Sequence, residues 1–554
     1  MSRASRGAQP HGRTLMVQGT ASDVGKSLLV AALCRILRED GYAVAPFKSQ
    51  NMSLNSYVTW DGKEIGRAQG MQADACGILA TTNMNPILLK PKKDMVSQVV
   101  VHGKPLGDYE ARTYREEVLA EAEPIVREAL DRLRADYDIV VLEGAGSPAE
   151  INLKDRDIVN MRAAGWADAP VVLAADIDRG GVFAAIVGTL ELLEPEERGR
   201  VCGFVINKFR GDVSLLQPGL DWLEARTGKP VLGVVPYLAD VGLEDEDSLS
   251  LDLAMRAEAG AAASPGSGAD TLDIAVIRLP HLSNFTDLDP LRAEPDAAVR
   301  FVTRPEQWGE PDAVIVPGSK NTVDDLLWLR ASGMAERLDA HRRRGGHVVG
   351  LCGGYEMFGE TLRDPDLTES DLPETAGLGW FPFDVRFTAD KRTVRAKGMA
   401  ALPGFPSAYP VAGYEIHTGI VEWRTDLAAA DREGRPEPAA EAVRPFRLRE
   451  SRLGDELLAD GREAEEGCAS ADGRTWGTFL HGVLHNDDFR RAWLNDIRAS
   501  KGWAPADGGV RFNERRESAF ARLASHVRRH VDIARLKAIA GLTAAGPGSE
   551  EGGT

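Results

Sequence analysis

Short apolar runs alternate with amphipathic helical patterns over residues 13–240. Six runs have the length and composition of buried strands, namely RTLMVQG, YAVAPF, DIVVLEGAG, PVVLAAD, VCGFVIN and VLGVVP. Stretches between them, such as SLLVAALCRILRED, place apolar residues at helical spacing. Strands that are apolar throughout and are joined by helices are typical of parallel sheets covered on both faces. The pattern therefore predicts a doubly wound α/β domain over residues 13–252.

A second α/β series follows a segment without apolar periodicity. Residues 253–270 are rich in Ala, Gly, Ser and Pro, a composition typical of a flexible linker. LDIAVIRL, AVIVPG and HVVGLCGG then resemble strands, and less regular strands are expected around WFPFDVRF, YPVAGYEIH and TWGTFLHG. We predict a second α/β domain over residues 271–500. Large apolar side chains are few in residues 426–472, which indicates a surface insertion.

Composition and charge narrow the classes of protein. A chain of 554 residues with 43% hydrophobic and 27% charged residues is typical of two to four globular domains. No apolar run approaches the roughly 18 residues of a membrane span, so we expect no membrane association. The net charge of −18 argues against a nucleic-acid binder with a wide basic face.

The cysteines and the two ends of the chain complete this picture. Five cysteines lie far apart and form no CxxC pair, which favours a reducing cytoplasm over a disulfide framework or a zinc ribbon. Residues 1–12 lack the apolar core of a secretory signal and are expected to be disordered. Residues 501–554 carry a helical pattern and end in a polar, Gly-rich tail. A homo-oligomer is compatible with these features.

A Gly-rich loop joins the first predicted strand to a helix. GTASDVGKS runs from Gly19 to Ser27, and its backbone N–H groups, with Gly25 in the turn, are expected to bind the phosphates of ATP. Lys26 would reach the β and γ phosphates, and the Ser27 hydroxyl would bind Mg²⁺. Thr20 stands where the GxxxxGK[ST] pattern has its first glycine. An ordinary strand-to-helix turn is the alternative, which the strand–loop–helix context disfavours.

Polar residues at other strand ends extend this predicted nucleotide site. Glu143, at the end of an apolar strand, is the preferred Mg²⁺ ligand, and Asp176 and Asp178 are alternatives that also suit helix caps or loops. Lys48 ends the second strand and would stabilise a transferring phosphoryl group, unless it is a solvated end residue. Asn207 follows another strand and is a candidate for contacting the nucleotide, although turn chemistry accounts for it nearly as well.

The second domain contains a cysteine at a tight turn. Cys352 lies in HVVGLCGGYEMFG between an apolar run and a helical pattern, with Gly350 and Gly354 on either side. This arrangement predicts a nucleophile elbow in cysteine form. The following helix is expected to lower the pKa of the thiol. A buried structural cysteine is the alternative.

A cysteine nucleophile needs an acid/base partner and donors for an oxyanion. His481 and His417 each end an apolar strand, and we favour His481. Position 483 is Val483, so no carboxylate two residues after His481 is available to orient the imidazole. Cys352 and His481 therefore act alone or with a distant acid. The backbone N–H groups near Gly318 and at Gly353 are candidates for the oxyanion site, with a plain turn as the alternative.

The two halves together resemble the cobyric acid synthase family of cobalamin biosynthesis. The resemblance covers about residues 14–496. The phosphate loop also resembles that of dethiobiotin synthetase, which has the same departure from the standard pattern, and the second domain resembles class I glutamine amidotransferases. The motifs that carry the family resemblance are PFKSQNMSLNSYVT, LLKPKKDMVSQVVVHGK, EGAGSPAEINL, ADIDRGGVF, NKFRGD, LPHLSNFTDLDPL, PGSKNT, LCGGYEMFG, GYEIHTG and GTFLHG.

The resemblance implies a glutamine-dependent amidoligase. It implies amidation of carboxylates b, d, e and g of adenosylcobyrinic acid a,c-diamide, driven by ATP and Mg²⁺ through acyl phosphates. Cys352 would be the glutaminase nucleophile and His481 its partner. The absence of a third acid agrees with a subfamily that lacks the Glu of the usual triad. The polar residues that follow Lys48 would line the substrate site or form a hydrogen-bonded loop; they are Gln50, Asn51, Ser53 and Asn55.

Three other functions remain as alternatives. Cobyrinic acid a,c-diamide synthase belongs to the same class and differs in the corrinoid consumed. A nucleotide-dependent switch of the partitioning-ATPase type shares the loop but leaves Cys352 and His481 without a role. An enzyme with a degenerate cysteine domain would use free ammonia. We expect small-molecule substrates, namely a corrinoid, glutamine and ATP, and no nucleic acid.

Overall fold

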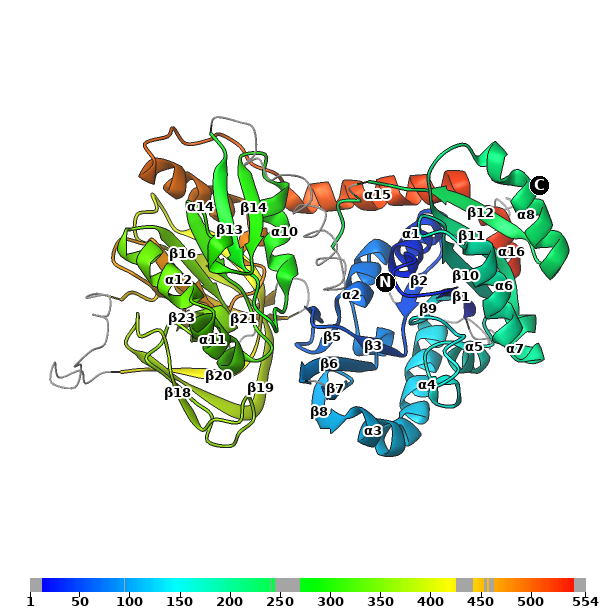
Figure 1. Cartoon of the computed structure of the whole chain (residues 1–554), viewed down its shortest axis with the longest axis horizontal. Helices are drawn as coiled ribbons and strands as arrows, with labels where there is room; N and C mark the ends of the chain where they lie inside the picture. The colour runs from blue at the N-terminus through cyan, green and yellow to red at the C-terminus, as the bar shows by residue number, and fades with distance from the viewer. Residues whose placement is uncertain are drawn as a thin grey trace, which may run out of the picture.

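The computed structural model describes residues 12–93, 95–239, 241–244, 270–424, 442–452, 456–457 and 463–542. Figure 1 shows two α/β units side by side, with helix α15 (Phe512–His530) running from the second unit back to the first. The predicted linker 253–270, apart from its last residue, and the predicted disordered start, apart from Gly12, lie outside the described residues.

The N-terminal unit contains the predicted doubly wound sheet. Its six strands are all parallel and lie in the order β12-β11-β10-β1-β9-β2, so β1 is central, with β9 and β10 on either side. The six predicted runs form these six strands, which confirms the fold class. The strands are β1 (Arg13–Gly19), β2 (Val44–Phe47), β9 (Ile139–Glu143), β10 (Val171–Asp176), β11 (Val201–Phe209) and β12 (Val231–Pro236).

Successive side chains of a strand point to opposite faces of a sheet, so these apolar strands give the sheet two apolar faces. Helices cover both of them. Met16 and Leu142 face one core, and Leu15 and Val141 face the other. Helices α4 (Leu119–Asp136), α5 (Met161–Ala167), α6 (Val182–Leu192) and α8 (Val213–Thr227) cover the first face, and α1 (Lys26–Glu39) and α2 (Arg67–Cys76) cover the second. The short helices α3 (Ala111–Thr113) and α7 (Pro195–Arg200) complete the unit.

Two small sheets, which the apolar pattern did not predict, lie beside the main sheet on the side of the second unit (Figure 1). One has the order β3-β6-β7-β8 and the other pairs β4 with β5. Three-residue strands such as β3 and β5 carry polar side chains inside, for example Asn51 and Glu64, and so lack an apolar signature. The strands are β3 (Gln50–Met52), β4 (Ser56–Val58), β5 (Glu64–Gly66), β6 (Ile87–Lys93), β7 (Val96–Val101) and β8 (Lys104–Glu110).

The second unit is built on another six-stranded sheet, in the order β14-β13-β15-β16-β25-β24. All its strand pairs are parallel except β24–β25. The strands are β13 (Leu272–Ile277), β14 (Ala297–Val302), β15 (Ala313–Val316), β16 (His347–Leu351), β24 (Cys468–Ala469) and β25 (Thr475–Thr478). The helices are α10 (Asp289–Ala293), α11 (Thr322–Ala331), α12 (Met334–Arg343), α13 (Gly353–Glu356) and α14 (Asp487–Ser500).

A mainly antiparallel sheet completes the second unit and corrects one expectation. Part of the predicted surface insertion 426–472 is core, because Phe446 and Leu448 are buried and β21 pairs with β19. Alternation in FRLRESR places these two apolar residues on one face. The strands are β17 (Thr361–Arg363), β18 (Glu374–Ala376), β19 (Phe383–Ala400), β20 (Tyr409–Trp423), β21 (Phe446–Arg452), β22 (Glu456–Leu457) and β23 (Ala464–Glu466).

The C-terminal helices return to the N-terminal unit. Phe520, Leu523 and Val527 of α15, with Leu536 of α16 (Ile533–Ile539), belong to the same apolar core as α1. Arg516 of α15 pairs with Asp74 at 2.8 Å and with Glu244 at 2.7 Å. From Arg516 on, the described part of the predicted extension 501–554 is therefore a layer of the first unit, whereas Lys501 and Val510 still bond to Asp312 and Arg490 of the second unit.

Candidate functional site

The predicted phosphate loop lies between β1 and α1. Gly25 has φ 91°, a left-handed conformation that glycine adopts without strain, and it is the residue before α1. Lys26 Nζ donates to the carbonyl oxygens of Ala21 at 2.9 Å and Gly146 at 3.2 Å, so its ammonium group lies over the loop. Asn207 Nδ2 donates to the Val24 carbonyl at 2.8 Å, which puts the predicted Asn207 against the same loop.

The side chains predicted at three strand ends meet at Glu143. Its Oε1 accepts hydrogen bonds from Ser27 Oγ and Lys48 Nζ, each at 2.9 Å, and its Oε2 accepts from Gln72 Nε2 at 2.5 Å. Burial raises the carboxyl pKa, but the charge of Lys48 and these hydrogen bonds outweigh it and hold the pKa of Glu143 below its ordinary value. Glu143 is therefore a buried carboxylate beside a hydroxyl, and these hard oxygen ligands suit Mg²⁺.

The alternative acidic residues lie on the other side of the loop. Asp176 Oδ2 is 3.0 Å from Lys208 Nζ, and Lys208 also donates to the Asp23 carbonyl. Asp178 pairs with Arg210 at 3.0 Å and is partly exposed. Neither contacts Ser27 in the described hydrogen bonds, so the geometry favours Glu143 as the metal ligand.

Cys352 occupies a strained turn between β16 and α13. Its φ of 50° with ψ of −111° is rare for a residue with a side chain, and such strain is characteristic of a nucleophile elbow. A Cβ at Gly354 would collide with the Val316 carbonyl, so only glycine fits there. Burial raises the pKa of Cys352, and the nearby Glu356 adds to the increase. The predicted lowering is therefore wrong for this state, because α13 is only four residues long and the thiol is desolvated.

His481 has an acidic partner that the sequence analysis did not identify. Its Nδ1 lies 2.7 Å from Asp287 Oδ2, and the Gly482 N–H donates to Asp287 Oδ1 at 2.8 Å. Burial raises the pKa of Asp287, but the His481 and Gly482 interactions hold it below its ordinary value. Asp287 belongs to the LPHLSNFTDLDPL motif. The distant acid that the sequence analysis left open is thus present, and it is far from position 483.

The other predicted residues of this site divide into two groups. A Cβ on Gly318 would lie 3.3 Å from His481 Cε1, and one on Gly353 would lie 3.0 Å from the Ser319 nitrogen, so these backbones and the histidine ring are neighbours. His417 instead stacks on Phe479 at 3.7 Å, and its Nδ1 lies 2.7 Å from the Gly419 carbonyl. These contacts give His417 a packing role in β20.

Buried polar contacts join the two units beside Cys352 and His481. Glu64 pairs with Lys90 at 2.6 Å and with Lys391 of the second unit at 2.5 Å. Burial lowers the pKa of Lys391 to about 8 even though Glu64 opposes that shift. Arg67 donates to Tyr414 Oη at 2.8 Å, and Tyr414 stacks on His481 with ring centroids 5.1 Å apart.

A cavity of about 490 Å³ lies next to the phosphate loop. Ser22 and Gly146 form its end at the loop, and Gln50 contributes a polar wall. Asn51, Ser53 and Asn55 do not line this cavity and bond instead to Gln69, to the Asn55 carbonyl and to the Phe285 N–H, which favours the hydrogen-bonded loop for these three. The remaining walls combine apolar residues with basic and acidic ones, including Met52, Leu89, Val99, Tyr109, Leu153, Arg115, Lys154, Arg156, Glu150 and Asp157.

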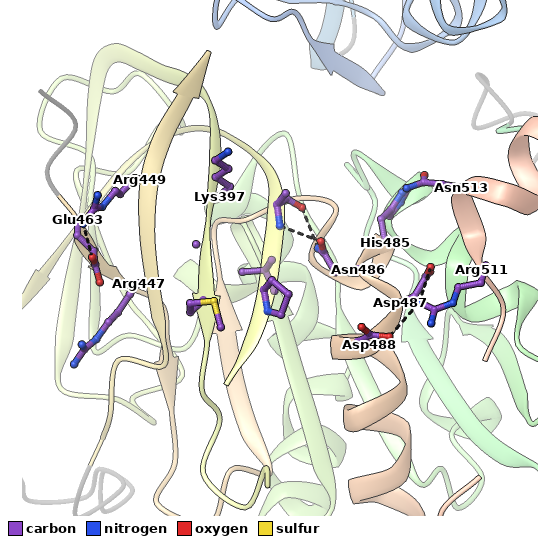
Figure 2. Close-up of a pocket in the computed structure, with 15 residues that line it drawn as sticks. Lys397, Arg447, Arg449, Glu463, His485, Asn486, Asp487, Asp488, Arg511 and Asn513 are labelled. Atoms are coloured by element: carbon purple, nitrogen blue, oxygen red, sulfur yellow. Dashed lines mark hydrogen bonds and ion pairs between the residues drawn. The ribbon is translucent and has the colours of Figure 1, made fainter. Parts of the chain in front are cut away.

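A second cavity, of about 550 Å³, is lined by residues of β19, β20 and β21 and by the start of α14 (Figure 2). Arg449 pairs with Glu463 at 3.0 Å, and Arg511 pairs with Asp488 at 3.1 Å. None of the predicted site residues lines this cavity. The predicted chemistry therefore belongs to the phosphate loop and to the Cys352 turn.

Comparisons with known proteins agree with these two sites. The CobQ/CobB/MinD/ParA nucleotide binding domain matches residues 15–251, and the CobB/CobQ-like glutamine amidotransferase domain matches residues 273–489. The chain thus joins a nucleotide-binding domain to a glutamine amidotransferase domain. In the described ranges, no helix combines the length and the apolar character needed to cross a bilayer.

Full-length relatives define the family. The cobyric acid synthase of Geobacillus kaustophilus (strain HTA426) is 50% identical over 525 residues, which is 94% of this chain and 96% of the relative. That of Sorangium cellulosum (strain So ce56) is 49% identical over 547 residues, 96% of this chain and 99% of the relative. This chain belongs to the cobyric acid synthase family, and it is a glutamine-dependent ligase.

Proposed function

We propose that this protein amidates carboxylates b, d, e and g of adenosylcobyrinic acid a,c-diamide to give adenosylcobyric acid, using glutamine and ATP. The names of its full-length relatives support the substrate. The observation that carries the proposal is the presence of two complementary centres in one chain. Cys352, His481 and Asp287 suit glutamine hydrolysis, and Ser27, Lys48 and Glu143 suit phosphoryl transfer.

The glutaminase half-reaction uses the Cys352 thiol. His481 Nε2 takes the thiol proton as Sγ attacks the amide carbon of glutamine, and His481 returns a proton to the leaving nitrogen, which departs as ammonia. Water then cleaves the thioester to release glutamate, with His481 again accepting a proton. Asp287 holds the proton of His481 on Nδ1, which leaves the lone pair of the ring on Nε2, the atom that must accept the thiol proton.

The synthetase half-reaction activates the acceptor. A carboxylate oxygen attacks the γ phosphorus of ATP, and the bond to the β–γ bridging oxygen breaks to release ADP. Ammonia attacks the acyl phosphate carbon, and phosphate leaves. Lys26 and Lys48 would stabilise the negative charge on the transferring group. Ser27 and Glu143 would hold Mg²⁺, which supplies charge neutralisation when bound.

The cavity beside the phosphate loop supports the position of the acceptor. It opens next to Ser22 and Gly146, so a carboxylate bound inside it would be close to a nucleotide on the phosphate loop. Met52 lines this cavity, and Ile151 follows the lining residue Glu150 in the sequence. Both are apolar residues that are 56% exposed. Apolar walls with Arg115 and Lys154 suit a macrocycle that has apolar faces and carboxylates around its edge.

Transfer of labelled nitrogen tests the substrate. Purified protein is incubated with ATP, Mg²⁺, amide-¹⁵N-glutamine and either adenosylcobyrinic acid a,c-diamide or cobyrinic acid, and the corrinoid is analysed by mass spectrometry. We expect the diamide to gain up to four labelled nitrogens and cobyrinic acid to gain none. Labelling of cobyrinic acid alone, with two nitrogens, would identify a cobyrinic acid a,c-diamide synthase instead.

Two cysteine variants test whether glutamine hydrolysis and ammonia-dependent amidation take place at separate centres. Cys352→Ala should lose glutamine-dependent amidation and keep amidation with added ammonium chloride. Cys202→Ala is the matched control, because Cys202 lies on β11, remote from both centres, and should retain both activities. Loss of ammonia-dependent amidation in folded Cys352→Ala would contradict the assignment of two separate centres.

A further inference from the structure

The catalytic imidazole of His481 is held on both of its ring nitrogens. Asp287 bonds to Nδ1 at 2.7 Å, and Asn284 Nδ2 lies 3.3 Å from Nε2. Both partners belong to one short segment, residues 284–287, and both are buried. Nε2 is the atom that must accept the thiol proton of Cys352, so its contact with Asn284 bears directly on the glutaminase reaction.

The orientation of the Asn284 amide follows from its other hydrogen bond. Its Oδ1 accepts from the Ser56 N–H at 3.0 Å, so the oxygen faces Ser56 and the NH₂ group faces His481. Because the Asp287 carboxylate accepts the proton on Nδ1, Nε2 of the neutral ring has a lone pair, and the Asn284 amide donates into it. In this state the lone pair of the base is already occupied.

The same amide crosses between the two units. Ser56 belongs to β4 of the nucleotide-binding unit, eight residues after Lys48 in the chain. A second bond lies alongside, from the Phe285 N–H to Asn55 Oδ1 at 3.2 Å. Residues 48–56 thus extend from the charge cluster around Glu143 to the amide that contacts His481.

Cys352 is in a matching resting state. The described contact of its Sγ is to the Ile416 carbonyl at 3.7 Å, and no described hydrogen bond joins it to His481. Its burial raises the thiol pKa. The thiol and the base are thus each held by another group, and proton transfer between them requires that Nε2 be released.

We propose that Asn284 is a positioning residue that keeps His481 Nε2 occupied until residues 50–56 move when ATP and the acceptor acid bind. Release of the amide then frees Nε2 for the Cys352 proton, so glutamine is hydrolysed only when an acyl phosphate can use the ammonia. This regulation rests on the proposed function, because it requires ligands of the synthetase centre to stimulate the glutaminase.

Asn284→Gly is the variant that isolates the amide. Asn284 has φ 51°, a conformation that glycine adopts without strain, so this substitution removes the side chain and not the turn. The assay is glutamate release from glutamine by the full chain, with and without ATP, Mg²⁺ and adenosylcobyrinic acid a,c-diamide. We expect the unloaded rate to rise about fivefold, the population shift that one neutral hydrogen bond supplies. The loaded rate should stay within about twofold of wild type, and stimulation by the ligands should fall accordingly.

Two further variants define the control and the second test. Asn55→Ala removes the neighbouring bond to Phe285 from the synthetase side and should raise the unloaded rate in the same direction. Arg395→Ala removes another bond across the interface, to the Val58 carbonyl at 3.3 Å, without touching His481, and should leave the stimulation unchanged.

The outcomes separate this proposal from the proposed function. If Asn284→Gly leaves the unloaded rate unchanged or lowers both rates together, Asn284 does not restrain the base and the proposal is wrong. If wild type amidates the diamide but its glutaminase is not stimulated by ligands, the restraint is refuted while the proposed function stands. Ammonia-dependent amidation by each variant reports that its synthetase centre is folded.

Discussion

Replacing Asp287 by asparagine tests the Asp287–His481 pair most directly. The substitution keeps the size of the side chain and removes its charge. The pair is buried at 2.7 Å, with 0% of the His481 side chain and 5% of the Asp287 side chain exposed, so water cannot replace the lost interaction. The asparagine NH₂ group can face Nδ1 and place the ring proton on Nε2, where it blocks transfer from Cys352.

The expected loss follows from the two effects together. A buried hydrogen bond to a charged group contributes about 1.5–3 kcal/mol, or about 10- to 150-fold in rate. The wrong tautomer adds to this, and the same substitution in a Ser-His-Asp triad lowers kcat about 10⁴-fold. We therefore expect glutaminase kcat in Asp287→Asn to fall about 10²- to 10³-fold.

Glutamate release under loaded conditions measures this effect, and ammonia-dependent amidation should remain at the wild-type rate. Glu466→Gln is the control, because Glu466 is a buried carboxyl group of the same unit that bonds to Thr478 and to the Phe479 N–H. A glutaminase kcat of Asp287→Asn within about threefold of wild type would refute the orienting role.

Three further predictions concern the phosphate loop, a buried carboxyl group and the α15 interface. Lys26→Ala should abolish amidation with glutamine and with ammonia, while unloaded glutamate release persists; retained ammonia-dependent amidation would contradict the role of the loop. Burial raises the pKa of Glu466 to about 8, so the folded state retains a proton that the unfolded state releases above about pH 4.5. Stability from this group is lost as pH rises towards 8, and the Tm of Glu466→Gln should fall less than that of wild type between pH 5 and 8; parallel Tm profiles would show that Glu466 is charged. Arg516→Ala leaves two acidic partners unpaired and should lower the unfolding free energy by about 3 kcal/mol in urea titrations, whereas Arg35→Ala, which breaks more exposed pairs, should cost less than about 1 kcal/mol.

The cluster around Glu143 follows from the sequence because of strand order. Apolar runs identified the strands, and polar residues at the carboxyl ends of neighbouring parallel strands must lie close together. Lys48 follows β2 and Glu143 ends β9, and these two strands pair directly. Ser27 starts the helix after β1, the other neighbour of β9. Local patterns therefore placed these side chains at one edge of the sheet, and the strand order seen in the structure selects Glu143 over Asp176.

Asp287 was missed because its pairing is not local. It lies 194 residues before His481, in a short 3₁₀ turn, η4 (Phe285–Leu288), which has no apolar periodicity. The pair forms because the turn after β13 meets the loop after β25, which requires knowledge of the whole sheet. The pKa of Cys352 was misjudged for a similar reason, since burial depends on tertiary packing and the helix-end argument uses only neighbouring residues.

The return of α15 and α16 to the first unit has a consequence for how the chain is made. The face of α1 that follows the phosphate loop is covered by residues 512–540, which leave the ribosome after the amidotransferase domain. At synthesis rates of about 5–20 residues per second, the nucleotide-binding core waits roughly 15–60 seconds between completion of β12 and arrival of its final layer. Until then Leu33, Ile36 and Leu37 of α1, which lie beside Ile533 and Leu536 of α16, have an exposed apolar flank, a surface suited to chaperone capture. A nascent chain that ends before α15 thus carries a phosphate loop on a core whose last layer is synthesised only after the amidotransferase domain.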